Sequence, residues 1–252
     1  MTFLSDPSVT NPVLSSLKIK SEDKIIFIRE NSLADSNFII THLFKQLLHQ
    51  KSRICLLTLH NNFNHYQTIG KILGYDLREA EGKGDLKIID LMEEMVEYID
   101  REIEDNIHDE RSQIIKCVYN TMEKQIEHFI STNNQPVYIV IDDASHFLDL
   151  GVELGPIIGF VNRCINLTSK DNVHTVINSH VESKSDLILA NSIQYVCDVF
   201  ICVSALKTGK STDITGVMTV VREDNEKKYH YRTFDRGVKT FNPCDTIYNL
   251  YK

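Results

Sequence analysis

Two adjacent carboxylates, Asp142 and Asp143, are the side chains of this sequence best placed to do chemistry. They follow residues 136–141, an apolar run rich in β-branched and aromatic residues. Such a run is typical of a strand that is buried on both faces. In an α/β fold the carboxyl end of such a strand faces the ligand crevice, where many nucleoside-triphosphate enzymes hold Mg²⁺ with an aspartate. The pair therefore raises the question of whether a phosphate cradle accompanies it.

The phosphate cradle is missing from the stretch where it would be required. A P-loop has the pattern G-x-x-x-x-G-K-[ST] between the first strand and the first helix, because its backbone N–H groups wrap the phosphates and its lysine meets their charge. Residues 29–36 occupy that place and contain no glycine and no lysine. They contain two carboxylates instead, Glu30 and Asp35, which would repel a triphosphate. The sequence therefore predicts no nucleotide cofactor.

One short stretch, residues 208–211, imitates the end of a P-loop with the letters T-G-K-S. Ser204 stands where the first glycine of the motif would be required. The stretch also precedes a predicted strand, whereas a P-loop opens a helix. We interpret it as a surface turn.

The remaining candidate site residues are weaker. Without a cradle, Asp142 and Asp143 are interpreted as strand-end caps or as the remnant of a nucleotide site. His180 follows the fifth predicted strand, where ATPases of this shape keep a polar sensor, although a structural histidine is the favoured interpretation. His60 and His65 flank an aromatic loop, but the spacing supplies no third ligand, so no metal site is predicted. No serine or cysteine is paired with a base in a known local signature, so no catalytic residue is predicted.

The elements that would position these residues alternate between strands and helices. Strands are predicted at 24–29, 54–59, 86–90, 137–141, 173–177 and 196–203. Helices are predicted at 38–48 (N-capped by Asp35 or Ser36), 64–73, 114–130, 156–168 and 187–192. Three strands with no helix between them end the chain, at 216–222, 229–234 and 238–241. This order predicts an α/β fold with a mainly parallel sheet, covered by helices on both faces, and C-terminal antiparallel strands.

Composition fits one soluble domain. Of 252 residues, 42% are hydrophobic and 25% are charged, which is ordinary for a chain with a buried core. We assign residues 1–20 to an N-terminal arm and 21–252 to a single domain. The net charge of −8 means that any nucleic-acid contact must come from a local patch or from partner chains. The six cysteines form no C-x-x-C pair, and no signal peptide or membrane span is evident, so an intracellular, reducing location is expected.

A specific resemblance is carried by residues 63–74, which read F-x-H-Y-x-x-x-G-x-x-L-G. A G-x-L turn at 84–86, the Asp142–Asp143 pair and the phrase L-x-L-G at 148–151 accompany it. Together these features resemble the family of Elongator subunit six over roughly residues 20–242. The acidic segment 91–112 and the 223–230 loop cannot be placed against that family.

The resemblance implies a RecA-like fold that lacks a P-loop. In that family, subunits four, five and six form a heterohexameric ring that docks on the catalytic subunits and binds tRNA. The whole complex modifies the wobble uridine (U34) of tRNA, and another subunit does the radical chemistry. This chain would then be a non-catalytic, ring-building member, located in the cytoplasm and also in the nucleus. The alternatives are an active RecA-type ATPase and a recombination accessory protein with the same fold.

In RecA-like rings the loops after strands four and five face the central pore. Here they correspond to residues 146–156 and 181–191, and Lys184 is the only cation of the second. This is a poor grip on phosphate, so we expect partner chains to supply most tRNA contacts. Which surfaces contact the neighbours is left open. Apolar residues of the last strands are interface candidates, and a buried sheet face explains them equally well: Val217, Val220, Tyr229 and Tyr231.

Overall fold

A computed structural model describes residues 11–31, 33–101, 110–209, 211–223, 225–235 and 237–243, without the side chains of 97–101 and 110–112. The strands are β1 (Ile25–Asn31), β2 (Arg53–Thr58), β3 (Leu86–Asp90), β4 (Val137–Ile141), β5 (Val173–Val181), β6 (Val199–Ala205), β7 (Gly216–Arg222), β8 (Asn225–Phe234) and β9 (Gly237–Phe241). The helices are α1 (Pro12–Leu17), α2 (Asn37–His49), α3 (Phe63–Leu73), α4 (Leu77–Gly82), α5 (Leu91–Arg101), α6 (Glu110–Thr132), α7 (His146–Asp149), α8 (Leu154–Asn166) and α9 (Lys184–Gln194).

All nine strands form one sheet in the order β3-β2-β4-β5-β1-β6-β7-β8-β9. The six strands from β3 to β6 run parallel, and β7, β8 and β9 join the β6 edge in antiparallel order. The predicted fold class is confirmed. Because the carboxyl ends of β1, β2, β4 and β5 meet at one edge, the polar residues that follow them gather there.

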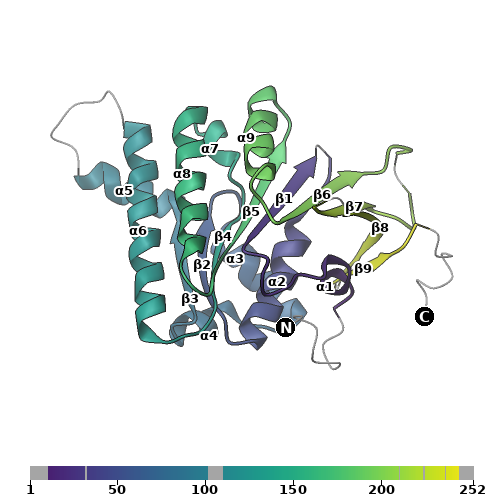
Figure 1. The fold of residues 1–252 in the computed structure, drawn as a ribbon, viewed down its shortest axis with the longest axis horizontal. Coiled ribbons are helices and arrows are strands. Elements are labelled where there is room, and N and C mark those ends of the chain that lie inside the picture. The colour runs from purple at the N-terminus through teal and green to yellow at the C-terminus, as the bar shows by residue number, and fades with distance from the viewer. Residues whose placement is uncertain are drawn as a thin grey trace.

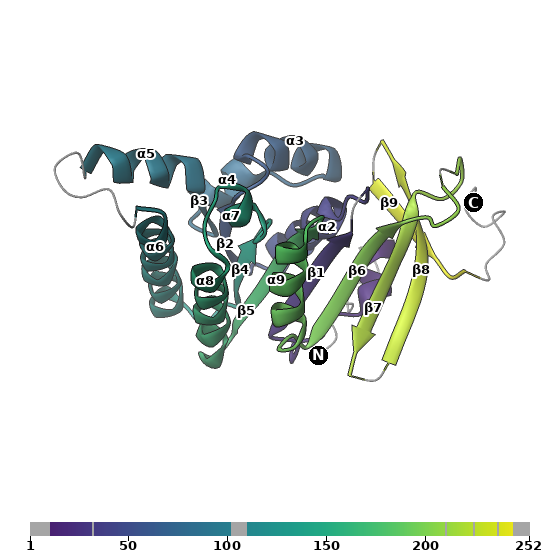
Figure 2. The ribbon, with the colours of Figure 1, turned by 90° about the horizontal axis from the view of Figure 1, so that it is seen from above.

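Alternating side chains of the central strands enter two separate cores. Ile54 and Leu56 of β2 belong to the core that α1, α2, α3 and α4 cover, whereas Cys55 and Leu57 belong to the core under the helices of the other face. Figures 1 and 2 show these two helical layers on either side of the sheet. Burial on both faces explains why β4 is a continuous apolar run, since neither face meets water.

The phrase at 63–74 has a structural reason at several of its positions. Asn62 caps α3 by accepting the backbone N–H of His65, and Tyr66 is fully buried. A Cβ on Gly70 would lie 2.6 Å from the ring of Tyr75. Gly74 ends the helix with a positive φ of 85°, the left-handed conformation that favours glycine. The phrase therefore specifies how α3 begins, packs and ends.

Some predicted boundaries were wrong. β5 continues to Val181 instead of ending at residue 177, because Asn178, Ser179 and His180 pair with β1. β8 begins at Asn225 and pairs along β7, where a loop was expected up to residue 228. The helix α4 was not predicted. Of the acidic segment 91–112, residues 91–101 form α5, and residues 102–109 lie outside the described part.

The two ends of the described chain pack on each other. Val13, Leu14 and Leu17 of α1 are buried in the core under β9, so residues 11–19 of the predicted arm lie against the domain. Residues 1–10 lie outside the described part. Among the interface candidates, Val220, Tyr229 and Tyr231 are buried in the same core, and Val217 is half-buried on the opposite face of the sheet. None of the described helices has both the length and the apolar character needed to cross a membrane.

Candidate functional site

A hollow of about 500 Å³ lies at the carboxyl ends of β1, β2, β4 and β5. Six carboxylates line it: Glu30, Asp35, Asp142, Asp143, Asp149 and Glu182. Four histidines also line it: His60, His65, His146 and His180. Among the described lining residues there is no lysine and no arginine. A hollow with this balance of charges repels a polyphosphate and attracts cations.

Asp142 organises the loop between β2 and α3. Its carboxylate accepts the backbone N–H groups of Leu59 (2.7 Å), His60 (3.2 Å) and Asn61 (3.0 Å). The hydroxyl of Tyr66 donates a fourth hydrogen bond at 3.2 Å. Burial raises the pKa of Asp142 to about 6, against the lowering effect of the three N–H donors. The carboxylate is thus surrounded by protein donors where a magnesium-binding aspartate would face its ion.

Glu30 occupies the place that a phosphate would need. At the amino end of α2, one oxygen of Glu30 accepts both the backbone N–H of Ser36 (2.7 Å) and its hydroxyl (2.8 Å). A helix amino terminus is the usual binding place for an anion, because its N–H groups are unpaired and the helix dipole is positive there. Burial raises the pKa of Glu30, and the two hydrogen bonds from Ser36 oppose that shift. An internal carboxylate therefore fills the anion position, and the residues present do not fit a bound nucleoside triphosphate.

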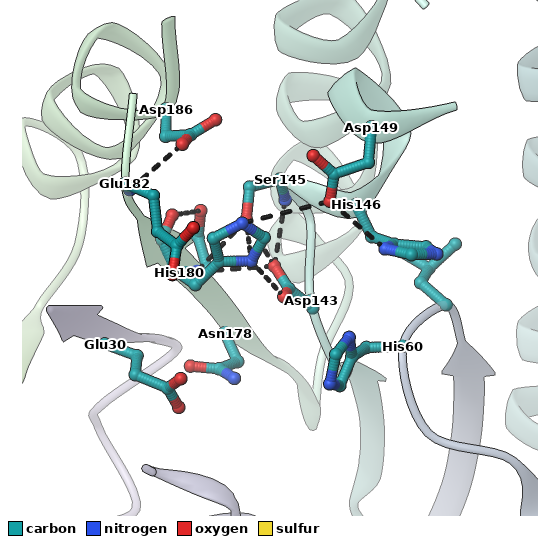
Figure 3. Close-up of polar contacts among 12 residues, drawn as sticks. Glu30, His60, Asp143, Ser145, His146, Asp149, Asn178, His180, Glu182 and Asp186 are labelled. Atoms are coloured by element: carbon teal, nitrogen blue, oxygen red, sulfur yellow. Dashed lines mark hydrogen bonds and ion pairs between the residues drawn. The ribbon is translucent and has the colours of Figure 1, made fainter. Parts of the chain in front are cut away.

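Asp143, Ser145 and His180 form a compact polar cluster in the hollow (Figure 3). Nδ1 of His180 lies 2.5 Å from one oxygen of Asp143 and 2.9 Å from Oγ of Ser145, which donates to the other Asp143 oxygen. Hydrogen bonding to Asp143 raises the pKa of His180 to about 9. Burial alone would raise the pKa of Asp143, but the hydrogen bonds and charge of His180 outweigh it and lower that pKa. The cluster is therefore an ion pair near neutral pH.

We predict that this ion pair makes stability depend on pH. The pKa of His180 is higher in the folded chain, so its contribution is complete below pH 6.5 and disappears as the pH rises through about 9. After allowance for its partial exposure, the loss is about 1–2 kcal/mol. Urea unfolding of the wild type and of His180→Gln at pH 6.5 and 9 measures it. Equal pH dependence in both proteins would contradict the prediction.

The other histidines lie around the rim of the hollow. Nδ1 of His146 is 3.3 Å from Asp149, and the rings of His60 and His146 are 5.7 Å apart, edge to face. His65 contacts the side chain of Asn37 at the start of α2. In the part of the chain that the structure describes, no three His, Cys, Asp or Glu side chains are arranged to hold a metal ion.

The structure thus brings three of the candidate residues together and separates the fourth. Asp142, Asp143 and His180 line one hollow, whereas Lys184 is an exposed first residue of α9. The two stretches predicted as pore loops are largely helical, because α7, the start of α8 and most of α9 fall within them. A capping box between Ser183 and Asp186 starts α9 at this point.

Sequence reasoning missed the roles of Glu30, Ser145 and Asn178. Glu30 was predicted only as a repulsive charge, and its bond to Ser36 requires the strand-to-helix geometry. Asn178 accepts from the Ser36 hydroxyl and donates to the backbone carbonyl of Asp142, which links β5 to both loops. The available signal was position, since each residue lies at or just after the carboxyl end of a parallel strand.

Two solved archaeal structures share this fold. An uncharacterized Pyrococcus horikoshii protein, solved in complex with an unknown peptide, has a TM-score of 0.63 at 11% identity and covers 89% of this chain and 93% of its own. A KaiC-like protein of the same organism has a TM-score of 0.53 at 13% identity and covers 86% and 89%. The RecA-like class of the fold is thereby confirmed.

Sequence comparison identifies the family. "Elongator complex protein 6" of Danio rerio is 25% identical over 255 residues, covering 91% of this chain and 96% of the relative. The Drosophila melanogaster protein of that name is 25% identical, covering 86% and 90%, and the Homo sapiens protein is 19% identical, covering 92% and 95%. The model of the Elongation complex protein 6 family matches residues 10–238. This chain, a RecA-like domain with a carboxylate at its anion position, therefore belongs to the Elongation complex protein 6 family.

Proposed function

We propose that this protein is a non-catalytic, structural subunit of the Elongator complex. Its relatives are named after that complex, and the alignment with this chain covers most of their length. The proposal of a non-catalytic role rests on two carboxylates. Glu30 accepts hydrogen bonds from Ser36 at the amino end of α2, and Asp142 accepts hydrogen bonds from the β2–α3 loop. A carboxylate at this end of α2 repels the phosphates that a RecA-type ATPase would hydrolyse, which supports a non-catalytic role.

The proposed role is architectural. The chain joins Elongator subunits four and five in a heterohexameric RecA-like ring, which docks on the catalytic subunits and supports tRNA binding and wobble-uridine modification. The proposed locations are the cytoplasm and the nucleus. The six carboxylates of the acidic hollow repel a tRNA backbone. This repulsion supports a complex in which partner chains supply most of the contacts with tRNA phosphates.

Co-purification with the two neighbouring subunits tests the architectural part. We expect this chain, co-expressed with subunits four and five, to elute with both as one species whose mass by light scattering fits a hexamer. Failure to associate, with each chain folded by circular dichroism, would contradict ring membership. It would favour an accessory protein of another RecA-like system.

ATP turnover by the isolated chain tests the non-catalytic part. We expect no Mg²⁺-dependent phosphate release above the buffer control and no binding of a fluorescent ATP analogue. Asp142→Asn, which keeps an acceptor for the loop, is the matched variant. Turnover by the wild type that this folded variant lacks would show an active ATPase.

A further inference from the structure

A groove runs through the helical layer formed by α5, α6, α7 and α8, at the end of the molecule away from β8 and β9. Figure 1 shows α6 and α8 side by side, with α5 and α7 near one end of the pair. Two hollows of about 190 Å³ each make up the groove, and Ile115 of α6 lines both. We call it the α6–α8 groove, defined by Met95, Ile114, Ile115, Tyr119, Gly159 and Arg163.

The half of the groove beside α5 is apolar. All of its described lining residues are apolar, and Met95, Ile114 and Leu150 among them are half-buried. On the same helix α5, Met92 and Val96 are each 58% exposed. An apolar hollow beside exposed apolar side chains is typical of a surface that binds another protein.

The other half of the groove carries two cations. Lys116 of α6 and Arg163 of α8 line it, and both are exposed. The guanidinium of Arg163 lies 5.7 Å from the ring centre of Tyr119, and among the described residues neither cation forms an ion pair. Glu123, one turn further along α6, accepts the hydroxyl of Tyr119 at 2.9 Å. Two cations without a carboxylate partner favour a ligand that brings its own acidic group.

The shape of the groove favours a helix as its ligand. Two separate hollows, each smaller than the roughly 300–1,000 Å³ of a small-molecule site, suit two side chains of one ligand. A Cβ placed on Gly159 would meet nothing within 4 Å, so the backbone of a partner has room to approach α8 there. Grooves of this kind take amphipathic helices whose apolar residues recur at every third or fourth position.

We propose that the α6–α8 groove docks an acidic amphipathic helix of a partner protein. Two apolar side chains of that helix enter the two hollows, and a carboxylate beside them contacts Lys116 and Arg163. A second copy of this chain is the less favoured occupant, because two chains of net charge −8 repel each other. The groove shares no described residue with the acidic hollow, so the inference is independent of the proposed function.

Fluorescence anisotropy of the full chain with a labelled synthetic peptide tests the inference. The peptide has about 15 residues, with leucine at every third or fourth position and glutamate beside the leucines. We expect saturable binding that weakens as salt increases, because salt screens the contacts of the two cations. A peptide with serine in place of each leucine, and one with lysine in place of each glutamate, should each bind roughly tenfold more weakly.

Gly159→Leu is the variant that fills the groove. Its side chain occupies the space of the docked helix and should weaken binding roughly tenfold, while the loss of a glycine favours α8 itself. Gly82→Leu is the matched control, because Gly82 ends α4 on the opposite face of the sheet and a Cβ there also meets nothing within 4 Å. Reversing both charges, with Lys116→Glu and Arg163→Glu together, should weaken binding of the glutamate peptide and strengthen binding of the lysine peptide. A folding defect does not produce that exchange.

Three results would overturn the inference. The first is that the glutamate peptide does not bind, or binds no better than its serine counterpart. The second is wild-type binding by Gly159→Leu when circular dichroism shows that variant to be folded. The third is a dimer of the isolated chain in light scattering that Gly159→Leu dissociates and Gly82→Leu does not, because a second copy would then be the occupant. Co-assembly with subunits four and five is unaffected by any of these results, so the proposed function is tested separately.

Discussion

Asp142→Ala is expected to destabilise the protein by about 3–5 kcal/mol, which lowers Tm by roughly 10 °C. The substitution leaves three backbone N–H groups and the Tyr66 hydroxyl without their acceptor. Asp142 itself is 2% exposed, so water does not replace the carboxylate easily. Each buried donor that loses its partner costs about 1–3 kcal/mol. Thermal and urea unfolding of the purified variant measure the loss.

A matched pair of variants separates this structural role from a metal-binding role. Asp142→Asn keeps one acceptor oxygen and should lose less stability than the alanine variant. Asp171→Ala removes an exposed aspartate and should change stability by less than about 0.5 kcal/mol. A carboxylate kept for a metal ion would behave differently, since its removal relieves the repulsion from Asp143. An unchanged or increased Tm in Asp142→Ala would therefore refute the structural role.

Asp143→Ala is the second large effect, with an expected loss of about 2–4 kcal/mol. The variant removes the partner of His180 and the acceptor of the Ser145 hydroxyl, and Ser145 is fully buried. His180 remains half-buried without its counter-ion, so its pKa should fall from about 9 toward or below its ordinary value. NMR titration of the imidazole measures that fall, and urea unfolding measures the stability.

A double-mutant cycle isolates the pair. His180→Gln and Asp143→Ala should each destabilise, and the double variant should lose clearly less than the sum of the two. The expected interaction free energy at pH 6.5 is about 1–2 kcal/mol, and it should shrink toward zero as the pH approaches 10. Strict additivity at pH 6.5 would show that the two side chains do not interact, whatever their distance.

The features that depend only on neighbouring residues in the sequence were predicted correctly. β4 and β3 have the predicted boundaries, and for β4 the reason is local, because an apolar run bounded by polar residues admits one burial pattern. Gly74 ends α3 as predicted, since the left-handed conformation favours glycine there. The missing P-loop was also visible, because that motif is contiguous and its absence from residues 29–36 is a local fact.

Only the tertiary structure decided the chemistry of the site. Residues 178–180 are polar and suggest a loop, yet they extend β5 because β1 lies beside them and supplies hydrogen bonds. Glu30 was predicted to repel a phosphate, and the fold places its carboxylate at the amino end of α2, where it accepts two hydrogen bonds from Ser36. Asp142 meets its donors on a loop about 80 residues away in the chain. Such partners are set by which strands are neighbours in the sheet, and no local pattern encodes that order.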